Sequence, residues 1–333
     1  MRRIRVHVKN TAWNTPEAAE IFTITPERFA RGLAAHPELA PYVEATYSLG
    51  EDGWPAAAAD AEALVGWDVR IDDAARATPK LRLIHVIGAG VEHLMPMDWL
   101  PPHIAMVNSK GIHASRAGEF GLMAVLMLHS RIPAIVDQQK RQQWTSLYAG
   151  PIAGRTLLGG GGGLRGGPRP RHAKLLGLNV IGVSRHGRPA DGVDRMVTPD
   201  RLDEVLPQAD FVFVATPATA ETTNLLDRRR LSLIKRGAGI ANVGREPVVD
   251  YRALADLLRS GHLSGAILDV FNQEPLPASS PFWSVPNLIV TPHVSADDND
   301  SYAELTIDLF LRNLRRYLAG EPLLNMVRPD LGY

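Results

Sequence analysis

Three polar side chains in the second half of the chain each follow an apolar run that is typical of a buried strand: Arg245, Glu274 and His293. The carboxyl ends of parallel strands in an open α/β sheet meet at one crevice, so we expect these side chains to converge. Hydride transfer to a 2-keto acid needs a cation, a proton donor that titrates near neutrality and an acid that orients this donor. Glu274 would hold the imidazole of His293 and raise its pKa, while Arg245 supplies the cation.

A second chemical feature is the stretch from Gly154 to Arg185, which has the pattern strand, glycine-rich bend, helix, strand. Gly161, Gly163 and Gly166 fall on the G-x-G-x-x-G register of a mononucleotide-binding unit. In such a unit the pyrophosphate lies on the free N–H groups at the start of the helix. A glycine-rich loop that binds nothing is the alternative interpretation.

The composition of residues 159–170 conflicts with that pattern. Gly159 and Gly160 stand where a buried strand would carry β-branched residues, and Pro168 and Pro170 fall inside the expected helix. A proline inside a helix costs ~3 kcal/mol. Either the helix begins later or is bent, or these residues are a local reading-frame artefact, which a peptide mass spectrum would decide.

The end of the second strand in this stretch predicts which dinucleotide is bound. An NAD-binding unit carries a carboxylate there for the ribose 2′-hydroxyl. Here the sequence reads Ser184-Arg185-His-Gly-Arg188, with two guanidinium groups and no carboxylate. A guanidinium fork suits a 2′-phosphate, with the serine hydroxyl as a further donor. We therefore expect NADP(H) to be preferred and NAD(H) to be possible, with a solvated basic loop as the alternative.

A turn in the first half of the chain has the composition of a small-anion site. Gly88-Ala-Gly-Val91 follows an apolar run, and its glycines would let the backbone N–H groups of Ala89, Gly90 and Val91 face a small anion. Trp67 would form a wall of the same pocket. A plain strand-to-helix turn and a packed surface tryptophan are the alternatives.

The elements that must position these residues alternate between strand and helix along the chain, which predicts an α/β protein. We expect two doubly wound parallel-sheet lobes: residues 1–108, completed by 297–333, and residues 109–296. An alanine-rich helix is expected over residues 55–62. Residues 113–144 read as two amphipathic helices broken at Pro133, with an apolar face large enough for a subunit interface.

The bulk composition excludes several classes of function. Of the 333 residues 45% are hydrophobic and 22% charged, and the net charge is zero, so we expect no nucleic-acid partner. The chain has no cysteine, which excludes disulfides and thiolate zinc sites, and we propose no metal. No apolar run has the length of a membrane span, and the N-terminal residues do not have the pattern of a signal peptide. We expect a soluble, cytoplasmic protein without a membrane partner.

Several motifs in this order resemble the D-isomer-specific 2-hydroxyacid dehydrogenase family over essentially the whole length. They are Gly88-Ala-Gly-Val91, ASRAGEF, Ala215-Thr-Pro-Ala-Thr219 with Asn224-Leu-Leu, ANVGR, LDVFNQEPLP and TPHVS. Within the family the chain is most similar to the glyoxylate/hydroxypyruvate reductase branch, where a basic Ser-Arg also accompanies NADPH. The resemblance implies a flavodoxin-like substrate lobe and a Rossmann cofactor lobe with a cleft between them.

The resemblance also implies a role for each matching residue. Arg245 would bind the substrate carboxylate and carbonyl, Glu274 would pair with the histidine, and His293 would be the acid/base. Asp269 would bind the nicotinamide carboxamide. The cofactor would also be lined by Thr216, Pro217 and Val243, and the substrate carboxylate would be clasped by the backbone of Ala89, Gly90 and Val91. The family further implies a homodimer formed through the cofactor lobe, and a helix over residues 298–319 that returns to the N-terminal lobe.

These features predict an NADPH-dependent reductase that converts a small 2-keto acid to the D-2-hydroxy acid. A non-catalytic dinucleotide sensor or corepressor on the same fold is the alternative from another class, and phosphoglycerate dehydrogenase is the alternative within the family. Formate dehydrogenases carry glutamine at the position of Glu274 and so fit less well. Glu246 stands where the family usually has glycine; its carboxylate either pairs with Arg245 or, as we expect, faces solvent.

Overall fold

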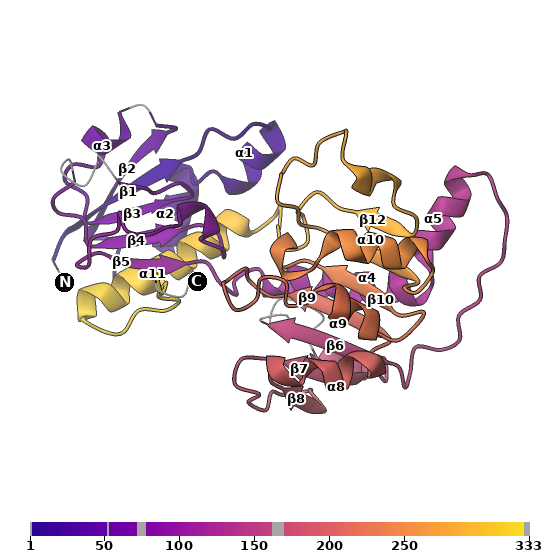
Figure 1. Cartoon of the computed structure of the whole chain (residues 1–333). Helices are drawn as coiled ribbons and strands as arrows, with labels where there is room; N and C mark the ends of the chain where they lie inside the picture. The colour runs from indigo at the N-terminus through magenta and orange to yellow at the C-terminus, as the bar shows by residue number, and fades with distance from the viewer. Residues whose placement is uncertain (1, 52, 72–77, 162–169, 330–333) are drawn as a thin grey trace. The chain divides into compact units, whose positions relative to one another are not determined.

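The computed structural model describes residues 2–51, 53–71, 78–161 and 170–329. The chain divides into two compact units, Met1–His113 with Asp298–Tyr333, and Ala114–Asp297. Each unit is built on one sheet of parallel strands (Figure 1). The α/β fold class with two doubly wound sheets is therefore confirmed. The chain passes from the first unit to the second between residues 113 and 114 and returns between residues 297 and 298.

The first unit contains a sheet of strand order β2-β1-β3-β4-β5, the flavodoxin-like order. Its strands are β1 (Ile4–Asn10), β2 (Val43–Leu49), β3 (Ala63–Gly66), β4 (Leu83–Val86) and β5 (Ala105–Asn108). Its helices are α1 (Pro16–Phe22), α2 (Pro26–Ala34), α3 (Trp54–Ala57), the 3₁₀ turn η2 (Glu92–Leu94) and α11 (Tyr302–Ala319).

The C-terminal helix α11 belongs to the core of this first unit. Its buried face, with Ile307 and Phe310, packs against the apolar face of the sheet that includes Val6 and Val8 (Figure 1). Gly32 of α2 lets the two helices approach closely, because a Cβ at this position would lie 2.4 Å from Ile307. Helix α11 thus packs in the same unit as the N-terminal residues.

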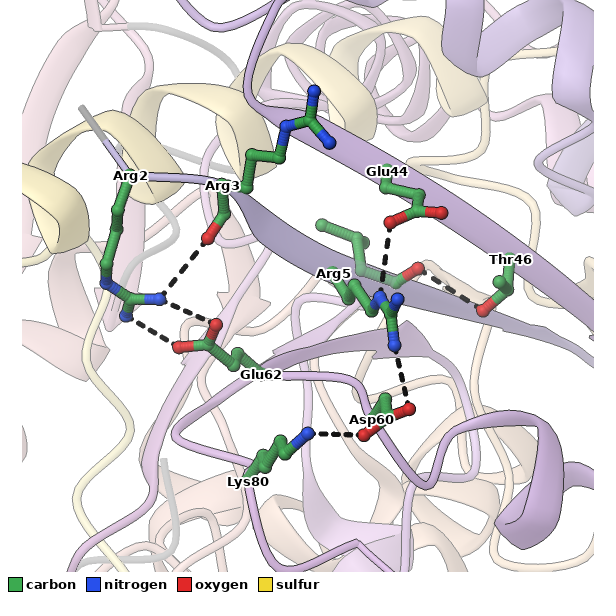
Figure 2. A network of polar contacts seen from close by, with 9 residues as sticks. Arg2, Arg3, Arg5, Glu44, Thr46, Asp60, Glu62 and Lys80 are labelled. Carbon is green, nitrogen blue, oxygen red and sulfur yellow. Dashed lines mark hydrogen bonds and ion pairs between the residues drawn. The ribbon is translucent and has the colours of Figure 1, made fainter.

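Ion pairs connect the amino ends of neighbouring strands in the first sheet, as Figure 2 shows. Arg5 of β1 bonds Glu44 of β2 and Asp60 of the loop before β3, and Asp60 also accepts from Lys80. Arg2 bonds Glu62 at 2.6 Å. Most of these side chains are largely exposed, so the ion pairs contribute little to the stability of the unit.

The second unit contains a sheet of strand order β12-β11-β10-β9-β6-β7-β8. Its strands are β6 (Thr156–Gly161), β7 (Asn179–Val183), β8 (Arg195–Val197), β9 (Phe211–Ala215), β10 (Gly239–Asn242), β11 (Gly265–Leu268) and β12 (Leu288–Val290). From β6 the strands β7 and β8 follow toward one edge of the sheet, and from β9 the strands β10, β11 and β12 follow toward the other edge. The topological switch point, where open α/β sheets bind dinucleotides, therefore lies between β6 and β9.

Helices cover this second sheet and bury its apolar strands. They are α4 (Ala114–His129), α5 (Ile132–Lys140), α7 (Pro170–Leu175), α8 (Leu202–Val205), α9 (Arg228–Leu233) and α10 (Tyr251–Arg259), with 3₁₀ turns η3 (Pro199–Arg201), η4 (Leu206–Gln208), η5 (Glu246–Val248) and η6 (Pro281–Ser284). Among the described residues, no single helix has both the length and the apolar character to cross a bilayer. Within the same described ranges, α4 and α5 meet the criteria of length and composition as a pair, which is bent by 67°.

Some expected elements differ from the observed ones. The helix expected over residues 55–62 is the single turn α3. The break in the long amphipathic stretch lies at Arg131, whose φ is 56°, and Pro133 stands in the first turn of α5, where its missing N–H costs nothing. For the same reason Pro170 is compatible with α7, which begins at this residue. Strands β5 and β8 and helix α1 were not predicted, because each is short.

Candidate active site

His293 and Glu274 form a hydrogen-bonded pair beyond the carboxyl ends of β12 and β11. The imidazole Nδ1 lies 2.7 Å from Oε2 of Glu274. This bond raises the pKa of His293 above its ordinary value of 6.5, although partial burial opposes the rise. Nδ1 is held by the carboxylate, so Nε2 is the ring nitrogen that can present a proton to a ligand.

The turn after β11 fixes Glu274 in this pair. The Phe271 backbone N–H donates to Oε1 of Glu274 at 2.7 Å, while Oε2 faces the histidine. Burial raises the pKa of Glu274, but the bonds from His293 and Phe271 outweigh it and lower the pKa overall. Glu274 therefore stays ionised and can stabilise an imidazolium.

Asp269, at the end of β11, holds the backbone that carries His293. Its side chain is completely buried and accepts bonds from the Thr291 hydroxyl (2.5 Å) and the N–H groups of Val294 and Ser295 (both 3.0 Å). His293 itself has a φ of 54°, in the left-handed region that costs roughly 1–2 kcal/mol for a residue with a Cβ. The bonds that Asp269 accepts from residues on both sides of His293 thus hold this residue in a strained backbone conformation. The role that the resemblance implies for Asp269, binding the nicotinamide, stays a proposal.

The turn after β10 carries Arg245. Asn242 accepts from the Gly244 N–H at 2.9 Å and donates to the Arg245 carbonyl oxygen at 3.1 Å. The amide of Asn242 also donates to the Tyr251 hydroxyl, which in turn donates to the carbonyl oxygen of Val270 (both 3.0 Å). This buried chain of bonds joins the Arg245 turn to the loop after β11.

The charge of Arg245 acts on both members of the histidine–glutamate pair. The guanidinium lowers the pKa of Glu274 and also that of His293, in each case as one of the smaller contributions. The three residues predicted to converge therefore interact electrostatically within one unit. The arrangement contains a permanently charged guanidinium group, a carboxylate and an imidazole that can carry a proton.

The backbone at the switch point is closely packed around Thr216, which follows β9 and is buried. A Cβ at Gly160, near the end of β6, would lie 3.4 Å from Oγ1 of Thr216. A Cβ at Gly244 would lie only 2.5 Å from the Thr216 carbonyl oxygen and 2.6 Å from its nitrogen. Glycine at these positions lets the strand ends come together where a dinucleotide would lie, so the described residues fit such a cofactor.

The structure describes some of the remaining predicted cofactor residues. Gly161 ends β6, and Gly163 and Gly166 lie outside the described residues. Pro217 and Val243 directly follow Thr216 and β10, and the Pro217 carbonyl oxygen accepts from Thr222 at 2.7 Å.

Ser184, Arg185 and Arg188 follow β7, as predicted. The guanidinium of Arg185 bonds the carboxylate of Glu221, which lies in the loop after β9. Both side chains are exposed. Glu221 is distant in sequence, so the pattern at the end of β7 gave no sign that a carboxylate lies beside Arg185.

In the first unit, Ala89, Gly90 and Val91 follow β4. The amide of Asn108 donates to the Ala89 carbonyl oxygen at 2.8 Å and so fixes this turn. Trp67 packs over the preceding Gly88, where a Cβ would lie 2.2 Å from the indole ring. The indole also stacks on His93, with ring centroids 4.0 Å apart. The tryptophan is therefore fixed beside the turn, and its role as a pocket wall stays a prediction.

Two further acidic side chains, Asp297 and Glu246, interact with the histidine–glutamate pair. Burial raises the pKa of Asp297 to about 6, and its charge interacts with His293, Asp269 and Arg116. Glu246 does not simply face solvent as expected: its carboxylate is half-buried and accepts from the Asn272 N–H at 2.6 Å. The contact of Glu246 with Asn272 joins separate elements, which residue spacing alone does not show.

The seven-stranded sheet with its switch point, the histidine–carboxylate pair and the arginine fit an NAD(P)-dependent oxidoreductase. Comparison with known proteins gives the family. The sequence profile described as "D-isomer specific 2-hydroxyacid dehydrogenase, NAD binding domain" matches residues 122–295. The chain belongs to the D-isomer-specific 2-hydroxyacid dehydrogenase family and is a member of this class of enzymes.

Relatives and solved structures agree with this assignment. The chain is 29% identical over 284 residues to glyoxylate/hydroxypyruvate reductase B of Serratia proteamaculans, covering 81% of this chain and 85% of the relative. It is 32% identical over 259 residues to D-3-phosphoglycerate dehydrogenase of Mycobacterium leprae, covering 77% of this chain but only 48% of that protein.

Among solved structures, a D-isomer specific 2-hydroxyacid dehydrogenase from Xanthobacter autotrophicus Py2 in complex with NADPH and MES has a TM-score of 0.82, at 29% identity and full coverage of both chains. An NADPH-dependent glyoxylate/hydroxypyruvate reductase from Sinorhizobium meliloti in complex with NADP and sulfate has a TM-score of 0.81, at 26% identity, with 99% of this chain and 100% of that chain covered.

Proposed function

We propose that the protein reduces a small 2-keto acid, such as glyoxylate or hydroxypyruvate, to the D-2-hydroxy acid with NADPH. The observation that carries this proposal is the 2.7 Å bond between His293 and Glu274, with the charge of Arg245 acting on both. This combination provides a proton donor, its orienting carboxylate and a cation for an anionic substrate.

When bound, the nicotinamide supplies the hydride. His293 would hold the proton at Nε2 and deliver it to the substrate carbonyl oxygen, because Nδ1 is held by Glu274. Arg245 would bind the substrate carboxylate and polarise the carbonyl group. The ionised Glu274 stabilises the protonated imidazole before transfer, which favours reduction at neutral pH. We assign the backbone N–H groups of Ala89, Gly90 and Val91, with Trp67 as a wall, to substrate binding in the first unit.

Residues after β7 support the preference for NADP(H). Ser184, Arg185 and Arg188 offer a hydroxyl and two guanidinium groups for a 2′-phosphate. The solved relatives from X. autotrophicus and S. meliloti are complexes with NADPH and NADP. We assign the 2′-phosphate to Arg185, which would then exchange or share its bond with Glu221. Thr216, Pro217, Val243 and Asp269 would line the rest of the cofactor.

Phosphoglycerate dehydrogenase activity is a second candidate, because such enzymes are 30–32% identical to this chain. The chain spans about half the length of these relatives. A substrate with a phosphate group needs more cationic partners than glyoxylate does, so a comparison of the two substrates discriminates between the candidates.

We also propose a homodimer formed through the second unit. Helix α4 exposes Met123 and Leu126, α5 exposes Ile135, and the segment that follows exposes Trp144 (97%) and Tyr148 (89%). Exposed large apolar side chains are typical of subunit interfaces. Light scattering after gel filtration should give twice the mass of one chain, and Leu126→Asp should give a monomer.

Substitution of the assigned acid and cation tests the proposed reaction. We expect His293→Ala and Arg245→Ala to lower turnover of glyoxylate with NADPH by about 10²–10⁴-fold while the circular dichroism spectrum is unchanged. Turnover at the wild-type rate in either variant would refute the assignment.

A further inference from the structure

Glu246 begins the 3₁₀ turn η5 directly after Arg245 and bonds the turn that carries Glu274. Its Oε2 accepts from the Asn272 backbone N–H at 2.6 Å. The neighbouring N–H, that of Phe271, donates to Oε1 of Glu274 at 2.7 Å. Two consecutive backbone donors of one turn thus bind two carboxylates, one of which is the partner of His293.

This arrangement brings two like charges to the same turn. Burial raises the pKa of Glu246, and the charge of Glu274 raises it further, while the bond from Asn272 lowers it. A half-buried carboxylate beside another one is costly unless backbone donors compensate. The Asn272 bond therefore stabilises both the carboxylate and the conformation of the turn.

The turn is also fixed from its other side. Tyr251 donates to the Val270 carbonyl oxygen at 3.0 Å and is itself bonded by Asn242. Val270 and Asn272 flank Phe271, so the residue that bonds Glu274 is held between two links to the Arg245 turn. The acceptor in the first link is the neutral carbonyl oxygen of Val270, whereas the acceptor in the second link is the charged carboxylate of Glu246.

We infer that Glu246 is a positioning residue that holds the turn of residues 270–274 so that Glu274 meets His293. The inference rests on the proposed function, in which His293 is the proton donor. Without the Glu246 bond the Asn272 N–H loses its acceptor, the turn relaxes, and Glu274 moves away from Nδ1 of His293. The imidazole then loses its proton at lower pH. The resulting decrease in activity affects kcat rather than KM.

Two substitutions of Glu246 separate its acceptor role from its charge. Glu246→Ala removes the acceptor, whereas Glu246→Gln keeps a carbonyl oxygen for Asn272 and removes only the charge. Asp250→Ala is the matched control, because Asp250 also accepts a backbone N–H (Ala253, 2.9 Å) but caps α10 and does not bond the Glu274 turn. The readouts are the His293 titration by NMR in protein without cofactor, and kcat and KM for glyoxylate with NADPH.

For Glu246→Ala we expect a His293 titration at lower pH and a kcat reduced about 10-fold, the effect of one hydrogen bond to a charged group, with KM changed less than threefold. Glu246→Gln should restore most of both, and Asp250→Ala should lower only thermal stability. A wild-type titration in Glu246→Ala, or an equal loss in Glu246→Gln, would overturn the inference. The NMR titration needs no turnover, so failure of the proposed reaction is distinguishable from failure of this inference.

Discussion

Replacement of Asp269 by asparagine should destabilise the backbone that carries His293. The Asp269 carboxylate accepts from Thr291 and Val294 on one oxygen and from Ser295 on the other. An asparagine has one acceptor oxygen only, so its NH₂ group would face at least one of these donors. At a completely buried site no water replaces the lost bond.

The magnitude follows from these bonds. One buried donor without an acceptor costs about 1–3 kcal/mol. For a unit of 150–250 residues each kcal/mol lowers the melting temperature by about 2–4 °C, so we expect a decrease of about 2–12 °C. His293, with its φ of 54°, would relax toward an unstrained conformation, and kcat should fall as well.

The assay is thermal unfolding of Asp269→Asn without cofactor, followed by turnover and a fluorescence titration with NADPH. Thr291→Val, which removes one of the three donors, is the control and should lie between wild type and Asp269→Asn in stability. If Asp269→Asn melts at the wild-type temperature and loses only affinity for NADPH, its carboxylate serves the nicotinamide alone and the reasoning about His293 is refuted.

Three further predictions concern the cofactor, the first unit and pH. Arg185→Ala should weaken NADPH binding about 10-fold in a fluorescence titration and leave NADH unchanged, and equal losses would contradict the 2′-phosphate assignment. Gly88→Ala would place a Cβ 2.2 Å from Trp67 and should cost about 1–3 kcal/mol in chemical unfolding; wild-type stability would show that the indole moves freely. Glu274 raises the pKa of His293 above its ordinary value of 6.5, so the imidazole is protonated below pH 6.5 and kcat/KM for reduction should be constant there. As the pH rises through the raised pKa of His293, kcat/KM should fall. In Glu274→Gln this fall should move to lower pH, and an unchanged profile would exclude His293 as the proton donor.

The fold was predictable because buried parallel strands are continuous apolar runs. Runs such as residues 211–215 and 239–242 are unambiguous, and their order along the chain implies the sheet. The alanine-rich residues 55–62 have high helix propensity, yet only one turn forms, since tertiary packing decides so short a segment. Strand β8 has only three residues, too few for a periodic pattern.

Glu274 and His293 were predictable as candidate residues because they lie in the loops that follow β11 and β12. The supporting contacts were not, because each joins separate elements: Glu246 to Asn272, and Arg185 to Glu221. An acceptor such as Asp269 also reads in sequence only as a polar residue at a strand end. Which donors reach it depends on the path of the 291–295 segment, which spacing does not determine.

The most direct test of the account is turnover by the unmodified enzyme. Glyoxylate, hydroxypyruvate and 3-phosphohydroxypyruvate are each assayed with NADPH and with NADH, by the loss of absorbance of the reduced nicotinamide. We predict that glyoxylate or hydroxypyruvate with NADPH gives the highest kcat/KM. Binding of NADPH without oxidation by any 2-keto acid would contradict the central claim and identify a protein that senses the dinucleotide.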